Sequence, residues 1–409
     1  MLPTAIPLAD RAGEAISRLA GASGSGTLAK LDGATLLGER AMLAGTSIPG
    51  RKSAGGGCRL FDAVGDTVAL NLARTADREL LPALFETEDL ITHNDEAIRA
   101  HIARSDASAL VMRARSMGLA IARENENLHA GARDCVELVT GTPAVAPRSV
   151  PRVLDLSALW AGPLAAHLLW LAGAEVVKVE SRSRPDAMRS SNTAFYALLN
   201  QGKASVVLDF ADSTHRQALL HLIAASDIVI EAARPRALLQ LGIDAAQLVQ
   251  TRPGLVWISI TGHGVQGEAA DWVGFGDDCG VAGGLSAALR AASGRPGFVG
   301  DAIADPLTGI HAALAAWQLW TSGRSGRFGV AMSHVVASCL AEARANDPVA
   351  LENCLKAWSG AAGKPFPAVN RRTIGPVASF GEHTRSAMSQ AEACFRSRRS
   401  NPSDKQWWH

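Results

Sequence analysis

The sequence predicts an α/β protein, with a Rossmann-like parallel sheet flanked by helices and a smaller α+β domain before it. The first observation is a regular alternation after residue 150, where short apolar runs typical of strands are separated by stretches of helical pattern. The second is a segment with three prolines at 141–151 (GTPAVAPRSVP), which resembles a linker. The third is the length of 409 residues, which favours two domains.

The second part of the chain supplies the expected sheet. We expect its strands at 153–156, 175–179, 206–210, 228–231 and 255–260. Helices are expected between them, at 162–171, at 213–225 with Ser213 as the cap, and from 237. Parallel sheets bind ligands outside the carboxyl ends of their strands, so we expect a site at that edge.

The first part mixes helical and strand patterns. An amphipathic helix is expected over 1–20, a strand over 66–73, a helix capped by Asp77 over 77–85, and helical pattern over 95–122. These patterns predict the following division of the chain: a smaller domain over 1–140, a linker over 141–152, the Rossmann-like domain over 153–385 and an atypical tail over 386–409.

The composition favours a soluble cytoplasmic protein. Hydrophobic residues make up 47% and charged residues 19% of the chain, and the apolar runs are too short for a membrane span. No signal peptide is evident. The net charge of +1 favours neither nucleic acid nor an acidic surface as a partner. The six cysteines form no CxxC pair, which argues against a zinc site or disulfides, and none is expected beside a base.

Two motifs are candidates for function. Residues 304–311 (ADPLTGIH) place Asp305 before a proline and an apolar helix, a pattern typical of a helix cap, so capping and function both remain open. Residues 262–267 (GHGVQG) fit the GxGxxG spacing of a dinucleotide site. That site also needs a helix at the third glycine and an acidic residue about 20 positions later, and both are missing here.

Several blocks together resemble the family III CoA transferases. These blocks are VLDLSALWAGPLAAHLLWLAGAEVVKVE, NQGKASVVLDF, SDIVIEAARPRALLQLGI, PGLVWISITGHGVQGEAADWVGFGDD and ADPLTGIHAALAAW. The resemblance covers roughly 151–330. The first 140 residues resemble the family's small domain but precede the CoA-binding core, which suggests a permuted or fused chain. Such a chain needs a second chain or half to complete the functional unit.

The resemblance implies the roles of several residues. Asp305 occupies the place of the aspartate nucleophile, which attacks an acyl-CoA thioester and forms first an anhydride and then an aspartyl thioester. Gly55, Gly56 and Gly57 resemble the loop that closes over this site. The implied CoA-binding residues are Leu159, Trp160, Ala161, Arg182, Arg184, Arg189, Glu231, Ala232, Arg234, Thr261 and His263. Lys203 and Arg236 are further candidates for the CoA phosphates, and His263 has loop packing as its other interpretation.

The chain also departs from the family pattern. The family's ENFRPG segment is EAARPR at 231–236, and Trp160 stands where formyl-CoA transferase has a glutamine. Phe275 replaces the histidine of the family's racemases, which makes an acyl-CoA racemase or isomerase the weaker alternative. A catalytically inactive acyl-CoA-binding homologue is the other alternative. The resemblance implies coenzyme A as substrate, a carboxylic acid acceptor, no metal and an interlocked homodimer.

Overall fold

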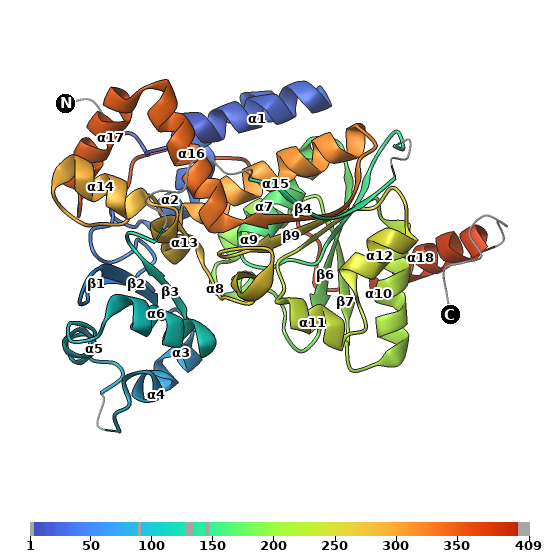
Figure 1. Ribbon diagram of the computed structural model, residues 1–409. Helices are drawn as coiled ribbons and strands as arrows, with labels where there is room; N and C mark the ends of the chain where they lie inside the picture. Colours follow the sequence, from blue (N-terminus) through green and yellow to red (C-terminus); the bar gives the residue numbers. More distant parts are fainter. Residues whose placement is uncertain (1–3, 89–90, 127–134, 144–146, 400–409) are drawn as a thin grey trace.

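A seven-stranded sheet organises the second part of the chain. The computed structural model describes residues 4–88, 91–126, 135–143 and 147–399. The strand order is β4-β10-β9-β8-β5-β6-β7 (Figure 1). The strands are β4 (Glu137–Thr142), β5 (Arg152–Asp155), β6 (Glu175–Ser181), β7 (Ala204–Leu208), β8 (Ile228–Glu231), β9 (Val256–Thr261) and β10 (Ser325–Ala331). All neighbours are parallel except β4 and β10, so the predicted parallel sheet is confirmed with one antiparallel strand at its edge.

Helices cover both faces of this sheet because its side chains alternate between two cores. Val153 of β5 packs in a core with α7 (Ala161–Leu171) and α15 (Ala304–Thr321). The next residue, Leu154, packs in a core that includes α10 (Ser213–Ala225), α12 (Ala245–Thr251) and α18 (Thr384–Arg399). Strand β5 lies between β6 and β8, so consecutive crossovers diverge from it in opposite directions, and ligands bind at such a switch point.

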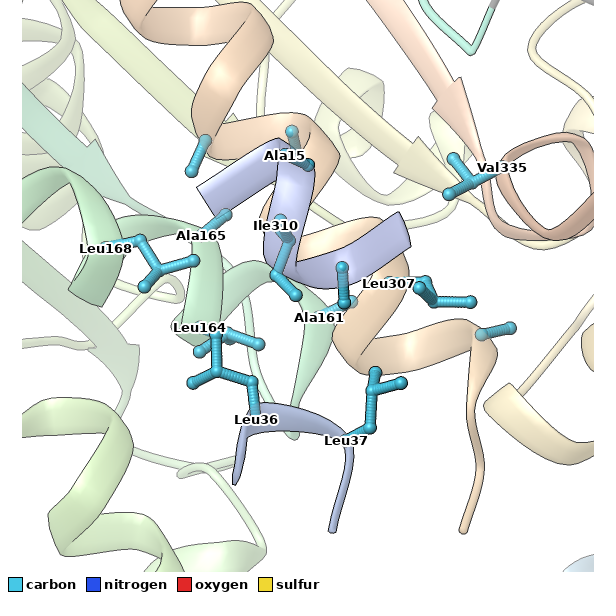
Figure 2. Close-up of a cluster of buried hydrophobic side chains, with 14 of the residues drawn as sticks. Ala15, Leu36, Leu37, Ala161, Leu164, Ala165, Leu168, Leu307, Ile310 and Val335 are labelled. Carbon is cyan, nitrogen blue, oxygen red and sulfur yellow. The ribbon is translucent and has the colours of Figure 1, made fainter. Parts of the chain in front are cut away.

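The N-terminal helices pack on the same core as the sheet. Helix α1 (Ala9–Ser23) begins eight residues later than the expected start, and α2 (Gly33–Ala44) follows it. Figure 2 shows Ala15 of α1 and Leu36 and Leu37 of α2 beside side chains of α7 and α15. The start of the chain therefore lies against the helices that border the predicted site.

A separate small core lies in the first part of the chain (Figure 1). It is built from the antiparallel strands β1 (Cys58–Asp62), β2 (Thr67–Asn71) and β3 (Ala120–Arg123) with α4 (Leu81–Phe85), α5 (Asp95–Ile102) and α6 (Ala107–Ser116), and α3 (Thr75–Glu79) precedes α4. The helix expected over 77–85 is two short helices. Asp77 lies inside the first, where its carboxylate accepts the Arg74 backbone N–H, so Asp77 is not the N-cap. The domain boundaries themselves stay a prediction.

The remaining elements complete the described part of the chain. They are the 3₁₀ turns η1 (Leu28–Lys30) and η2 (Gly267–Ala270) and the helices α8 (Met188–Ser191), α9 (Thr193–Asn200), α11 (Pro235–Gln240), α13 (Gly276–Ala282), α14 (Leu285–Ser293), α16 (Met332–Asn346) and α17 (Pro348–Gly360). Asp212, rather than Ser213, caps α10. Only a 3₁₀ turn follows the GHGVQG segment, which supports rejecting a dinucleotide site there.

The predicted tail is described only in part. Its residues up to 399 belong to α18, whereas the rest, including Trp407 and Trp408, lies outside the described residues. Among the helices in the described ranges, none combines the length and apolar character needed to cross a bilayer.

Candidate active site

A cavity of about 240 Å³ lies at the carboxyl edge of the sheet. Its walls come from the segments that follow β5, β8, β9 and β10, together with the loop before α13 and the start of α15. The lining residues include Leu159, Ala161, Ala232, Arg234, Thr261, Phe275, Asp305 and Met332. The cavity therefore lies at the edge where parallel sheets usually bind ligands.

Asp305 presents its carboxylate to this cavity from the first turn of α15. The helix begins at Ala304, so Asp305 lies inside it and does not cap it, which corrects the capping interpretation. Its carboxylate instead accepts a hydrogen bond from the Ala161 backbone N–H, at the first residue of α7. The partial positive charge of a helix N-terminus stabilises an anion at this position.

Gly276 allows this close packing. A Cβ at Gly276 would lie 2.3 Å from Asp305 Oδ2 and 2.2 Å from the Ala302 carbonyl oxygen. Both distances are below any van der Waals contact, so the backbone of α13 can approach the carboxylate only because residue 276 has no side chain.

The electrostatic surroundings hold the pKa of the Asp305 carboxyl close to neutral pH. Burial raises the pKa of its carboxyl, and the neighbouring carboxylates of Asp277 and Asp278 raise it further. The Arg40 guanidinium and the Ala161 N–H oppose the rise, and the pKa is about 7. A carboxylate that is poorly compensated in this way is a stronger base and nucleophile than an ordinary surface aspartate.

Asp277 shares this environment. Burial, with the Asp301 carboxylate close by, raises its pKa to about 6, although Arg40 and a hydrogen bond from Ser53 act in the opposite direction. The pKa of the Arg40 guanidinium is raised, because the attraction of the Asp301 carboxylate outweighs the opposing effect of burying Arg40. The site thus contains several carboxylates, and the Arg40 guanidinium from α2 lies among them.

Comparison with known proteins identifies the domain that carries this site. Residues 151–346 match the model of CoA-transferase family III. This part of the chain belongs to CoA-transferase family III. The expected family is confirmed, and the match starts at the last residue of the proline-rich segment.

Three curated relatives are CoA transferases. A succinyl-CoA–D-citramalate CoA-transferase of Chloroflexus aurantiacus is 33% identical over 40% of this chain and 43% of its own. A succinate–glutarate CoA-transferase of Agrobacterium fabrum is 30% identical over 49% and 54%. A formyl-CoA:oxalate CoA-transferase of Streptomyces avermitilis is 31% identical over 45% and 47%. The chain spans about half the length of the curated relatives that it matches.

Among solved structures, a hypothetical protein from Mycobacterium tuberculosis is 29% identical, with a TM-score of 0.43 over 50% of this chain and 59% of that chain. The family match does not include the first 150 residues, so the resemblance of that segment to the family's small domain stays a prediction.

The structure brings together one group of the predicted family III residues. Leu159, Ala161, Ala232, Arg234 and Thr261 line the same cavity as Asp305. They come from the ends of three strands, and the turn after each strand aims them at one space.

A second group lies behind the cavity wall. Trp160 is 1% exposed and packs edge to face on Phe195. Glu231 is buried, and its carboxylate accepts the Ala233 N–H at 2.8 Å, so it supports the turn that carries Arg234. His263 is buried with its Nε2 3.5 Å from Asp278 Oδ2, which agrees with the packing interpretation of this residue.

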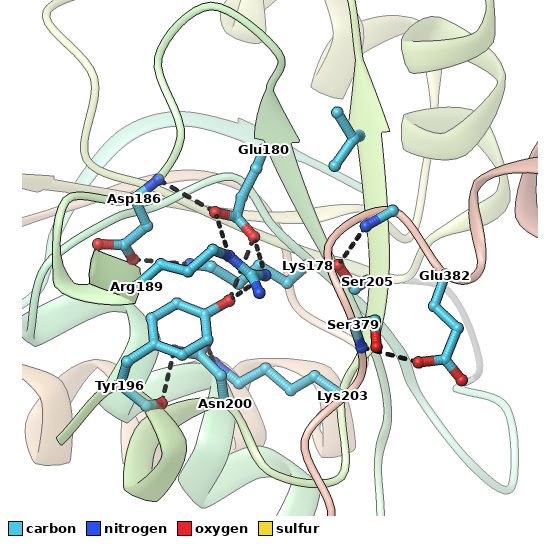
Figure 3. Close-up of polar contacts among 12 residues, drawn as sticks. Lys178, Glu180, Asp186, Arg189, Tyr196, Asn200, Lys203, Ser205, Ser379 and Glu382 are labelled. Atoms are coloured by element: carbon cyan, nitrogen blue, oxygen red, sulfur yellow. Dashed lines mark hydrogen bonds and ion pairs between the residues drawn. The ribbon is translucent and has the colours of Figure 1, made fainter. Parts of the chain in front are cut away.

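The predicted basic residues after β6 separate into two kinds. Arg182 and Arg184 are exposed, whereas Arg189 contacts Glu180 at 2.6 Å and stacks on Tyr196 (Figure 3). Lys203 is 4% exposed, and its ammonium donates to Asp155, to the Pro163 carbonyl and to Asn200. These three bonds use all its donors, so the structure corrects the prediction that Lys203 meets a phosphate.

The glycine loop reaches the site through Arg40 and Asp277. A Cβ at Gly55 would lie 3.6 Å from a terminal nitrogen of Arg40, and Ser53 at the start of the loop hydrogen-bonds Asp277. Gly56 has φ +78°, a conformation that favours glycine. The loop is therefore next to the carboxylate group, and its role as a lid stays a prediction.

Two cysteines lie beside histidines, which corrects the expectation that none would. Cys279 Sγ is 3.9 Å from His263 Nε2, and Cys339 Sγ is 3.4 Å from His311 Nε2. Burial raises the pKa of both thiols well above the usual value, so neither is a thiolate at neutral pH. The sequence did not show these pairs because their members come from different elements.

His263, Cys279 and Asp278 together place three possible metal-ligating atoms within 4.8 Å of one another. Asp278 already accepts hydrogen bonds from the Asn71 side chain and the Phe275 N–H, and Cys279 donates to the Gly262 carbonyl. These hydrogen bonds explain the arrangement without an ion.

Sequence reasoning missed Arg40, Gly276 and Asp277. Arg40 lies in an ordinary helix of the first part, far along the chain from the motif of Asp305. Gly276 and Asp277 stand in the stretch GFGD, where the family pattern points only to Phe275 in place of the racemase histidine. The adjacent glycine and aspartates were the available signal.

Proposed function

We propose that this protein moves CoA between an acyl-CoA thioester and a carboxylic acid, with Asp305 as the nucleophile. The observation that carries the proposal is the Asp305 carboxylate, which faces a cavity at the carboxyl edge of the sheet in the family III part of the chain. The pKa of this carboxyl is about 7. The relatives are named for reactions of this class.

The proposed first half-reaction transfers the acyl group and then the CoA. An oxygen of Asp305 attacks the thioester carbonyl, the carbon–sulfur bond breaks, and a mixed anhydride and CoA thiolate form. The thiolate then attacks the aspartyl carbonyl carbon. The anhydride carbon–oxygen bond breaks, and the first acid leaves as a carboxylate with an oxygen from Asp305.

The second half-reaction runs these steps in reverse with the acceptor acid. Its carboxylate attacks the aspartyl thioester, thiolate leaves, and the thiolate attacks the acceptor carbonyl of the new anhydride. Asp305 is regenerated with an oxygen from the acceptor. No oxidant and no net proton transfer are needed, because a thioester and a carboxylate enter and leave the cycle.

The cavity surroundings fit a long anionic substrate. A second cavity of about 810 Å³ adjoins the first, and Arg234 and Trp272 line both. Its basic lining residues are Arg115, Arg123, Arg234 and Arg236. Arg115 is already paired with Glu126 through both terminal nitrogens. We propose that the pantetheine arm passes Arg234 toward Asp305 while the CoA phosphates lie nearer the guanidinium groups of Arg123, Arg234 and Arg236, whose paired N–H donors suit phosphate.

A trapping experiment tests the nucleophile. Incubation with succinyl-CoA and hydroxylamine, followed by peptide mass spectrometry, should give a hydroxamate at Asp305. With a heavy-oxygen-labelled acceptor acid, one label should enter the Asp305 carboxylate. Asp305→Asn should abolish both signals. Asp244→Asn, at an exposed helix cap where asparagine caps as well as aspartate, should leave them unchanged.

A second candidate function is acyl-CoA binding without catalysis. It is favoured by Ala232 and Ala233, small residues that line the cavity where the family has an asparagine and an aromatic. Retained CoA binding with neither hydroxamate nor label at Asp305 across a panel of acyl-CoA donors would support it. Loss of chirality at the α-carbon without transfer would support a racemase, but Phe275, which lines the cavity, has no group that exchanges a proton.

We also propose that the protein acts in the cytoplasm as a homodimer, as its family resemblance implies. Light scattering coupled to size-exclusion chromatography measures the mass in solution directly. A mass of one chain at micromolar concentration would contradict the dimer.

A further inference from the structure

Arg40 and Asp301 form a largely buried ion pair beside the site. Arg40 Nε donates to Asp301 Oδ2 at 2.8 Å, and its terminal nitrogen contacts Asp301 Oδ1. The side chains are 19% and 2% exposed. A paired contact of this kind fixes the guanidinium and the carboxylate in one relative orientation.

Asp301 belongs to a strained turn that leads into Asp305. Gly300 has φ +74° and Ala302 has φ +42°, which is uncommon for a residue with a side chain. The Ala302 N–H donates to Asp277 Oδ1 at 3.1 Å, and the Ala302 carbonyl accepts the Asp305 N–H at 2.9 Å. Strained backbone of this kind persists only where its surroundings hold it. The ion pair at Asp301 and the bond to Asp277 hold it here.

Arg40 also contacts the other support of Asp305. Its guanidinium carbon lies 4.6 Å from the centroid of the Trp160 ring. Trp160 is the N-cap of α7, and the next residue, Ala161, donates its N–H to the Asp305 carboxylate. One side chain of α2 therefore touches both the turn before Asp305 and the residue before its hydrogen-bond donor.

We propose that Arg40 and Asp301 are positioning residues for Asp305, which hold its carboxylate in the orientation required for attack on a thioester. The inference rests on the proposed function of Asp305, and it adds the N-terminal helix α2 to the active site. Neither residue needs to touch the substrate.

The charge of Arg40 has a separate, measurable effect. The groups that surround Asp305 are the carboxylates of Asp277, Asp278 and Asp301, the thiol of Cys279 and the cations Arg40, Arg74 and Arg234. Arg40 lowers the pKa of Asp305 against the effect of burial. Its removal should therefore raise that pKa and shift the acid limb of the activity profile to higher pH.

The experiment compares four variants of the full-length protein. Arg40→Gln removes the charge and the ion pair, Arg40→Lys keeps the charge without the paired geometry, and Asp301→Asn removes the partner. Arg372→Gln is the matched control, because Arg372 forms a similarly buried ion pair with Glu39, the residue next to Arg40. The readouts are kcat and KM against pH, and the titration of Asp305 by NMR of protein labelled at the aspartate carboxyl carbons, assigned with Asp305→Asn.

In Arg40→Gln we expect the Asp305 pKa to rise by about one unit and kcat to fall about 10- to 100-fold. Arg40→Lys should restore the pKa but leave kcat low, since an ammonium cannot make the paired contact. Asp301→Asn should lower kcat without raising the pKa. Arg372→Gln should lower the melting temperature and leave the pKa in place.

Two results would overturn the proposal: an unchanged Asp305 titration in Arg40→Gln, or equal losses of kcat in Arg40→Gln and Arg372→Gln. If Arg40→Gln does not fold, Arg40→Lys and Asp301→Asn still separate charge from orientation. If the wild-type protein transfers no CoA, the proposed function fails, whereas the NMR titration still decides whether Arg40 acts on Asp305.

Discussion

Asp155, which is fully buried, and Asp305, which is half-buried, are two carboxylates near the same edge of the sheet, with opposite electrostatic surroundings. Asp155, the last residue of β5, accepts the Lys203 ammonium at 2.8 Å and the Ser157 N–H at 3.0 Å. Burial raises its pKa, but Lys203 and Lys178 outweigh this effect and hold the pKa at about 2. At Asp305 the effect of burial exceeds that of Arg40, and the pKa of its carboxyl is about 7.

The two carboxylates differ in whether the nearest cations donate hydrogen bonds to them. Lys203 and Lys178 direct their ammonium groups into a network with Asp155, Asp186 and backbone carbonyls, part of which Figure 3 shows. Arg40 gives its hydrogen bonds to Asp301 and influences Asp305 only from a distance. A fully paired carboxylate stabilises the fold, whereas an under-compensated one that faces a cavity is available for chemistry.

Exchanging each carboxylate for an amide should separate these roles most strongly. Asp305→Asn should reduce CoA transfer by at least about a thousandfold, because the nucleophile is lost. It should not destabilise the fold at neutral pH, since it removes a carboxylate that burial disfavours. Asp155→Asn should instead destabilise the protein. Steady-state kinetics and urea unfolding of both variants measure the contrast, and an active Asp305→Asn protein would refute it.

Breaking the paired network should show up as a loss of stability. Lys203→Met leaves Asp155 buried with fewer partners, which should cost about 3–5 kcal/mol in the free energy of unfolding. The folded-state pKa of Asp155 lies below its usual 3.8, so this pairing stabilises above that pH and its contribution is lost as the pH falls toward 2. Denaturant titrations at several pH values check this. Lys356→Met, in an exposed pair, should cost no more than about 0.5 kcal/mol.

A methyl group at Gly276 tests how tightly Asp305 is packed. Gly276→Ala places a Cβ 2.2 Å from the Ala302 carbonyl, so backbone or carboxylate must move. We expect a loss of about 1–3 kcal/mol in stability, with reduced kcat. Gly360→Ala serves as the control, because its added Cβ meets no atom within 4 Å. Calorimetry and kinetics that find both variants equal would show that the packing of Asp305 tolerates displacement.

The pH dependence of activity gives the smallest effect. With a pKa of about 7, Asp305 is anionic above and neutral below that value. The kcat/KM should therefore be about tenfold lower one unit below the pKa than one unit above it. Stability should change in the opposite sense. The folded pKa is raised above 3.8, so the folded state binds the extra proton and Asp305 destabilises increasingly as the pH rises from 3.8 through 7. Activity that is flat across this range would contradict an Asp305 nucleophile with the raised pKa.

The sequence alone predicted the parallel sheet, the edge at which its cavity lies and the family of the second part. These predictions succeeded because they depend on local patterns: apolar runs that alternate with helices, and motifs of a few adjacent residues. The same local pattern marked Asp305 as important but misjudged its role in the helix, since a cap is defined by backbone geometry that one residue type does not specify.

Only the tertiary structure decided which charges meet. Arg40 and Asp301 are 261 residues apart in the chain and form one ion pair, and Asp305 obtains its hydrogen bond from a different helix. The sequence predicted Lys203 as a phosphate ligand, but its ammonium is buried and donates to Asp155. Charges interact through space and solvent exposure, and neither is determined by position along the chain. Residue order therefore marked Asp305 as the proposed nucleophile, and folding decided that Arg40 is the cation placed near it.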